Sequence, residues 1–156
     1  MAEYARFIFQ GDASARAAAG RAFSVTFPEE ACRASVAGER AALWLGPDEH
    51  LLLAPAGSQV RIAADLENAL AVIPHSLVDV SERQVALTVA GPTARDLLAS
   101  GCPLDLDPEA FPVGMCTRTL FGKVEAVLWR PSAEEYHLEV GRSFADYVRE
   151  CLRESQ

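Results

Sequence analysis

Residues 121–140 read FGKVEAVLWRPSAEEYHLEV, two apolar segments joined by a polar turn. The alternation of apolar and polar residues on either side of PSAEE predicts two antiparallel strands. Residues 38–55 show the same order in GERAALWLGPDEHLLLAP. A strand, turn and strand in both halves of the chain predict an internal repeat.

The segments around these strands extend the repeat. A glycine-led helical segment precedes each pair of strands, GDASARAAAGRAF at residues 11–23 and GPTARDLLASG at residues 91–101. A second helical segment follows each pair, at residues 58–70 and 142–154. The predicted alignment pairs Gly11 with Gly91, Gly38 with Gly122, Trp44 with Trp129, and residues 51–53 with 137–139.

The final helical segment has a periodic apolar pattern. Its apolar residues recur at helical spacing, which predicts one face that docks on a sheet. These residues are Phe144, Tyr147, Val148, Cys151 and Leu152.

The order of elements predicts an α+β fold. Each half is expected to be a ferredoxin-like, split βαβ sandwich with an antiparallel sheet covered by helices, and the first half adds a strand around residues 77–80. We expect an N-terminal subdomain at residues 1–73 and a C-terminal one at residues 74–156, forming a compact pair or one domain.

Composition narrows the class of protein. The 156 residues carry a net charge of -8, and this field repels nucleic acid and anionic lipid. No continuous apolar stretch approaches the ~18 residues of a membrane span, and residues 1–10 lack the features of a signal peptide. The four cysteines show no C-x-x-C spacing. We expect a cytoplasmic protein with free thiols and without bound metal.

Motifs for catalysis are missing from the sequence. Neither a nucleophile motif nor a dinucleotide fingerprint occurs, so no catalytic residue is predicted. His50 and His137 occupy similar places in the repeat, between an acidic turn and an apolar strand, which favours a structural role. The candidates for holding a ligand are His75, Arg118 and Arg142, the two arginines because they lie near element ends in the second half.

Residues 75–148 resemble the gamma subunits of heterotetrameric sarcosine oxidase. The more specific matching pieces are GCPLDLDPEAFPVG at 101–114, CTRTLFGK at 116–123 and RSFADYV at 142–148, and WLGPDEHLLL at 44–53 extends the match. Glu82 departs from the family pattern, which usually has a histidine or similar residue there; it falls in a predicted turn, where a charge is easily accommodated.

The resemblance implies a role in a complex that oxidatively demethylates sarcosine to glycine, with hydrogen peroxide and a one-carbon unit for tetrahydrofolate as further products. Partners would be the alpha, beta and delta subunits. FAD, FMN, NAD and tetrahydrofolate are implied for the whole complex and none for this chain. The fold would be related to the folate-binding region of glycine-cleavage aminomethyltransferases. We therefore expect a non-catalytic assembly subunit, inactive by itself.

Two alternatives stay open. The chain could be a stand-alone folate or small-molecule binding protein, or a one-carbon transferase-like domain, with His75, Arg118 or Arg142 as ligands in a cleft between the halves. It could instead be a homo-oligomeric scaffold, because an isolated subunit can self-associate through a surface meant for a partner.

Overall fold

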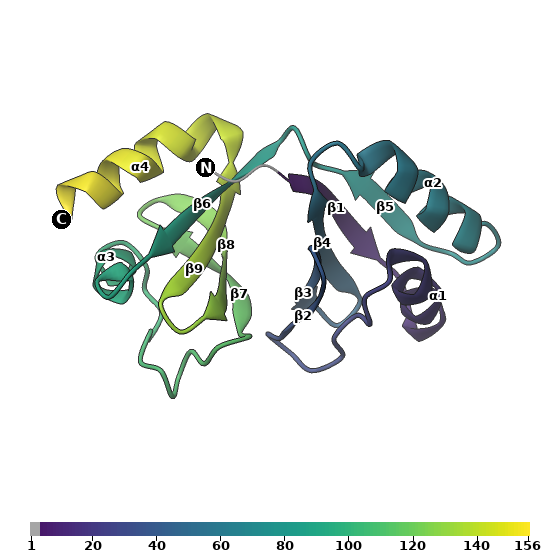
Figure 1. Ribbon diagram of the computed structural model, residues 1–156, viewed down its shortest axis with the longest axis horizontal. Coiled ribbons are helices and arrows are strands. Elements are labelled where there is room, and N and C mark those ends of the chain that lie inside the picture. Colours follow the sequence, from purple (N-terminus) through teal and green to yellow (C-terminus); the bar gives the residue numbers. More distant parts are fainter. Residues whose placement is uncertain (1–3) are drawn as a thin grey trace. The chain divides into compact units, whose positions relative to one another are not determined.

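The computed structural model describes residues 4–156 and divides them into two units, which we call the N-terminal unit, up to Glu82, and the C-terminal unit, Arg83–Gln156 (Figure 1). The boundary falls later than the expected one between residues 73 and 74. The reason is the strand Ser76–Asp79, which pairs with the first strand of the chain and so belongs to the N-terminal unit.

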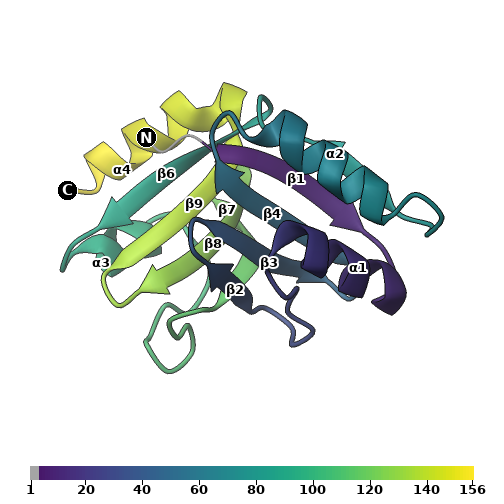
Figure 2. The same cartoon turned by 45° about the vertical axis from the view of Figure 1, so that its right-hand side comes forward.

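The N-terminal unit contains one antiparallel sheet and two helices. Its strands lie in the order β2-β3-β4-β1-β5, so β1 is paired with β4 on one side (Figure 2) and with β5 on the other (Figure 1). The elements are β1 Tyr4–Gln10, α1 Ala13–Phe23, β2 Ala34–Ala37, β3 Arg40–Gly46, β4 Glu49–Pro55, α2 Gln59–Ala69 and β5 Ser76–Asp79.

The C-terminal unit repeats this topology. Its sheet has the order β6-β9-β8-β7, which matches β1-β4-β3-β2, and in both units one helix follows the first strand and another follows the fourth. The elements are β6 Gln84–Ala90, α3 Ala94–Ala99, β7 Cys116–Phe121, β8 Val124–Ser132, β9 Glu135–Gly141, the 3-10 turn η1 Arg142–Phe144 and α4 Ala145–Glu154. The predicted α+β repeat is confirmed. Three strands separate the two helices of each unit, one more than in a ferredoxin-like unit.

Each unit has its own apolar core between its sheet and its helices. In the N-terminal unit the strand residues Phe7 and Leu52 pack with Phe23 of α1 and Leu66 of α2. The C-terminal core is built in the same way, from apolar residues of β6, β8 and β9 that pack against α3 and α4. Residues of alternating position reach these cores, as expected for strands with one helix-covered face.

Backbone contacts confirm most of the predicted alignment. The Gly11 N–H donates to the Asp48 carbonyl at 3.0 Å, and the Gly91 N–H donates to the Glu134 carbonyl at 2.9 Å, so both glycines tie the start of a helix to the turn between the third and fourth strands of their unit. The predicted pairing of the two glycines is therefore correct. Gly38 and Gly122 also match, because each opens a two-residue turn with φ +59°.

The predicted match of Trp44 with Trp129 is wrong. Trp44 lies opposite His50, which contacts the core residue Phe27 and therefore faces the helices. Trp129 lies opposite His137, and both alternate with core residues, so they face the other side of the sheet. One extra residue in a strand reverses the face of every later side chain. Consequently His50 and His137 do not occupy equivalent positions either.

No helix within residues 4–156 is long and apolar enough to cross a membrane.

Candidate functional site

His75, a predicted ligand residue, is engaged within its own unit. Its Nδ1 lies 2.7 Å from the Ile73 carbonyl oxygen and its Nε2 lies 3.2 Å from Glu67 Oε2 at the end of α2. Both ring nitrogens therefore face oxygen acceptors of neighbouring residues. These contacts fasten the segment between α2 and β5, which is a structural role.

Arg118 and Arg142 are exposed on the C-terminal unit. Arg118 lies on the edge strand β7 opposite Val127, on the sheet face away from the helices, whereas Arg142 begins η1. His75 belongs to the N-terminal unit, so neither unit contains all three predicted ligand residues. The positions of these three residues do not test whether they bind a ligand.

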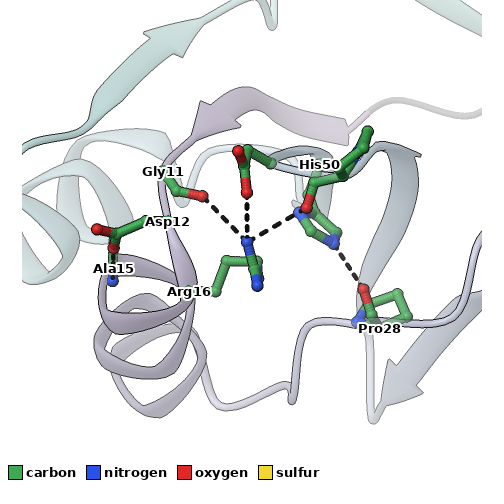
Figure 3. A network of polar contacts seen from close by, with 8 residues as sticks. Gly11, Asp12, Ala15, Arg16, Pro28 and His50 are labelled. Carbon is green, nitrogen blue, oxygen red and sulfur yellow. Dashed lines mark hydrogen bonds and ion pairs between the residues drawn. The ribbon is translucent and has the colours of Figure 1, made fainter.

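A network of polar contacts lies at the start of α1 (Figure 3). The Arg16 guanidinium donates to Asp48 Oδ1 at 2.7 Å and to the carbonyl oxygens of Gly11 at 3.3 Å and Pro47 at 3.2 Å. Asp12 caps the helix by accepting the Ala15 N–H at 2.9 Å. Arg16 thus joins the first turn of α1 to the β3–β4 turn. Sequence reasoning missed this arginine because its partners are distant in the chain.

His50 is buried beside this network. Because a carbonyl oxygen can only accept, its Nε2 donates to the Pro28 oxygen, 2.8 Å away, and Nδ1 is left as an acceptor without a partner among the described residues. Burial lowers the pKa of His50 below its ordinary value of 6.5, so the ring is neutral at pH 7. With 0% exposure it is out of reach of a substrate.

A pocket of about 390 Å³ lies between α1 and the segment after it. Arg16, Gly20 and Arg21 line it from the helix, and Thr26 and Glu29 line it from the segment. Arg16 already forms an ion pair with Asp48, so the positive charge that it brings to the pocket is largely used within the fold.

The C-terminal unit has a buried arginine of its own. Arg130 is 7% exposed and donates to the carbonyl oxygens of Phe111 at 2.8 Å and Ala133 at 2.7 Å. Its guanidinium also lies 5.6 Å from the ring centre of Tyr136. Arg130 therefore fastens the long α3–β7 loop to the end of β8.

A histidine and a glutamate meet on β9. His137 Nε2 lies 3.2 Å from Glu139 Oε1, and the His137 ring packs 5.5 Å from Trp129. An imidazole beside a carboxylate can transfer a proton, but these side chains are only 3% and 2% exposed. They are placed to support the sheet.

The predicted docking face of the last helix is only partly correct. Val148 is buried, and Cys151 and Leu152 pack against the core, as predicted. Phe144 and Tyr147, in contrast, remain 51% and 44% exposed. A hydrogen bond with the Cys151 thiol raises the pKa of the Tyr147 hydroxyl.

The described residues offer little for metal or dinucleotide binding. No group of three or more His, Cys, Asp or Glu side chains in residues 4–156 could hold a metal ion. The two glycines that begin the helical segments already donate their N–H groups to carbonyl oxygens, so those donors are unavailable to a phosphate. Both units are held together by internal hydrogen bonds, and they expose few reactive side chains.

Comparison with known proteins identifies the family. The model of the sarcosine oxidase, gamma subunit family matches residues 10–156. The chain belongs to this family. A sarcosine oxidase subunit gamma of Corynebacterium sp. strain P-1 is 36% identical over 108 residues, and that of an Arthrobacter species is 35% identical over 123 residues.

These gamma subunits are longer proteins. The alignments cover 69% and 78% of this chain but only 52% and 60% of the Corynebacterium and Arthrobacter relatives, so the chain spans little more than half of their length.

Solved structures agree with this membership. A chain of the heterotetrameric sarcosine oxidase of Corynebacterium sp. U-96, in complex with pyrrole 2-carboxylate, superposes with a TM-score of 0.92 and 26% identity over 99% of this chain and 80% of that one. Aminomethyltransferase T of the Bartonella henselae glycine cleavage system superposes with a TM-score of 0.71 and 15% identity over 96% of this chain and 43% of that one. The aminomethyltransferase-like fold is confirmed.

Proposed function

We propose that this protein is a non-catalytic assembly subunit of a heterotetrameric sarcosine oxidase. The observation that carries the proposal is the likeness to a chain of such a complex over nearly the whole sequence. The site geometry supports a role without catalysis, because the histidines and the glutamate that could move protons are buried or bonded. The complex would oxidise sarcosine to glycine and pass a one-carbon unit to tetrahydrofolate.

Other subunits would supply the reactive groups of this complex. FAD, FMN and NAD would be bound by the larger of the alpha, beta and delta partners, and tetrahydrofolate would receive its one-carbon unit there. The net charge of -8 and four free cysteines favour the cytoplasm as the location.

The test is co-expression of this chain, with an affinity tag, and the other oxidase chains of the same organism. We expect a purified complex that absorbs in the flavin region and forms hydrogen peroxide with sarcosine. Omitting this chain should lower the yield of assembled complex. Full assembly and full activity without it would refute the proposed role.

Binding of folate or another small molecule is the second candidate function. The pocket beside α1 is the observation that favours it, since Arg21 lines this pocket and a guanidinium suits an anionic ligand. Tetrahydrofolate titrated into the isolated chain should then saturate, and Arg21→Ala should abolish the signal. If Arg118→Ala or Arg142→Ala abolishes it instead, those residues hold the ligand.

A further inference from the structure

The sheet of the C-terminal unit has one strand fewer than the sheet of the N-terminal unit. Strand β6 matches β1, but among the strands of residues 4–156 only β9 pairs with it. In the N-terminal unit the corresponding side of β1 is covered by β5, which pairs with Phe7–Gln10. The equivalent edge of the C-terminal unit is therefore open within the described part of the chain.

The two units can be compared residue by residue at this edge. The glycine bonds to the β3–β4 and β8–β9 turns fix the same register in both units, so Phe7–Gln10 matches Leu87–Ala90. β4 aligns with β9 in the same way. This match continues without gaps into α2 and α4, and it places Ser58 at the position of Phe144.

The backbone of β6 directs polar groups to the open edge. Arg83 and Gly91, just outside its two ends, both bond to the β9 side. Because backbone groups alternate along an antiparallel strand, the N–H and C=O groups of the even-numbered residues point to the other side. Thr88 and Ala90 are exposed there, whereas Ala86 is 0% exposed. The accessible edge thus begins after Ala86 and has the four-residue length that β5 covers on β1.

A half-buried side chain marks the same edge. Leu66 of α2 is 0% exposed in a core to which β5 contributes Leu77. The counterpart of Leu66 on α4 is Leu152, which is only partly buried. No strand in the described C-terminal unit supplies an apolar side chain at the position of Leu77. The C-terminal core is therefore incompletely covered where the strand is missing.

β6 carries none of the features that prevent further pairing at a sheet edge. Its seven residues, QVALTVA, include no charged residue and no proline, and its register with β9 has no bulge. Natural edge strands are commonly protected by such features, because unpaired N–H and C=O groups accept another strand. The edge therefore suits strand addition, in which an extended peptide pairs with the backbone of a sheet.

We propose that the open edge of β6 binds an extended segment of another subunit of the complex, which adds a fifth strand as β5 does in the N-terminal unit. This proposal rests on the proposed function. The segment pairs with the backbone groups of Thr88 and Ala90. An apolar side chain at the position of Leu77 completes the core beside Leu152.

A second copy of this chain fits the edge less well. Four paired residues bury far less than the about 1,200 Å² of a specific interface, so this edge is too short to hold two whole copies together. Each copy also carries a net charge of -8, which opposes their approach. A segment that is tethered to an already bound subunit needs no large contact area, because its local concentration is high.

Amide hydrogen exchange, resolved by residue, tests the edge without a mutation. In the isolated chain the amides of Thr88 and Ala90 should exchange fast, whereas those of Leu87 and Val89, which bond to β9, should exchange slowly. In the assembled complex the first two should slow by at least about tenfold. Protection of Thr88 and Ala90 in the isolated chain would overturn the proposal. If that protection rises with concentration, a second copy covers the edge; if it does not, a segment of the chain itself does.

A proline at the edge provides the second test. Thr88→Pro removes the N–H that faces the open side and leaves the bonds to β9 intact, because Thr88 makes none of them. Its affinity for the other subunits should fall by at least about tenfold, since one hydrogen bond is lost and the ring obstructs the added strand. Thr88→Val is the matched control, because it keeps the N–H and the branched shape, and it should bind normally.

Circular dichroism should show that both variants are folded. If the complex assembles with Thr88 and Ala90 still exchanging fast, and if Thr88→Pro binds as tightly as Thr88→Val, strand addition at β6 is refuted while the proposed function stands. If the unmodified chain forms no complex, both are refuted.

Discussion

The two units contain the same type of turn in different surroundings. Gly38 and Gly122 have the same φ of +59°, and each begins the turn into the central hairpin. A Cβ on Gly38 would meet no atom within 4 Å, whereas one on Gly122 would collide with Tyr147. Left-handed backbone favours glycine in both turns, but only the C-terminal turn also needs the empty space. The two units thus share the backbone conformation of this turn and differ in the side chains that pack against it.

The same contrast separates core from surface throughout the repeat. Leu52 and Leu138 occupy matching core positions, whereas Ser58 and Phe144 occupy matching surface positions with opposite polarity. The cores should therefore respond alike to a mutation, and the surfaces should not. Three experiments test this comparison.

The largest effect is expected in the cores. Leu52→Ala and Leu138→Ala should each lower the free energy of unfolding by about 2–5 kcal/mol, because both side chains are fully buried between sheet and helices. Urea denaturation measures the loss. Amide hydrogen exchange should locate it in the mutated unit; equal loss of protection in both units from either variant would show that they unfold together, and the comparison of separate cores would fail.

A smaller effect is expected for Arg130 and Arg16, each of which hydrogen-bonds a loop or turn to a neighbouring element. Arg130→Met removes a charged donor from the buried Phe111 carbonyl and should cost about 2 kcal/mol. Arg16→Met breaks contacts that include an ion pair with the exposed Asp48 and should cost about 1 kcal/mol. Thermal and urea unfolding of the two variants check this order. A larger loss of unfolding free energy from Arg16→Met than from Arg130→Met would show that the contacts of Arg16 contribute more to stability.

The smallest effect concerns pH and only the N-terminal unit. Burial lowers the pKa of His50, so the unfolded chain takes up a proton near pH 6.5 while the folded chain does not. The contribution of His50 to stability is complete above pH 6.5 and is lost as pH falls from there to the lowered pKa. His50→Gln, which keeps a donor for Pro28, should flatten this loss in urea titrations at pH 7.5 and 5.5. An unchanged slope would exclude His50 as its source.

Much of the fold could be predicted because it depends on local patterns. Glycines at Gly11, Gly38, Gly91 and Gly122, with apolar alternation between them, were sufficient for the repeat and its α+β class. The subdomain boundary was harder, because β5 is assigned by its long-range pairing with β1. A strand around residues 77–80 is predicted for the first half, but the predicted boundary between residues 73 and 74 cuts that strand off from it.

The errors at particular side chains have physical causes. The match of Trp44 with Trp129 failed because the sequence does not show on which side of the tryptophan an extra strand residue lies. Phe144 was predicted to face the sheet from its helical spacing, but η1 is a 3-10 turn, and its tighter winding carries Phe144 away from the buried stripe of α4. The ligand roles of His75, Arg118 and Arg142 stay predictions.

The strand order also bears on the synthesis of the chain. In the C-terminal unit the last strand made, β9, is inserted between β6 and β8, and among the strands of residues 4–156 it is the only one that pairs with β6. During translation β6 therefore waits without a partner until residue 141 has left the ribosome, while β7 and β8 can already form a hairpin. A nascent chain that stalls before β9 would present an unpaired apolar strand, so this unit depends on completion of its final third to be protected from aggregation.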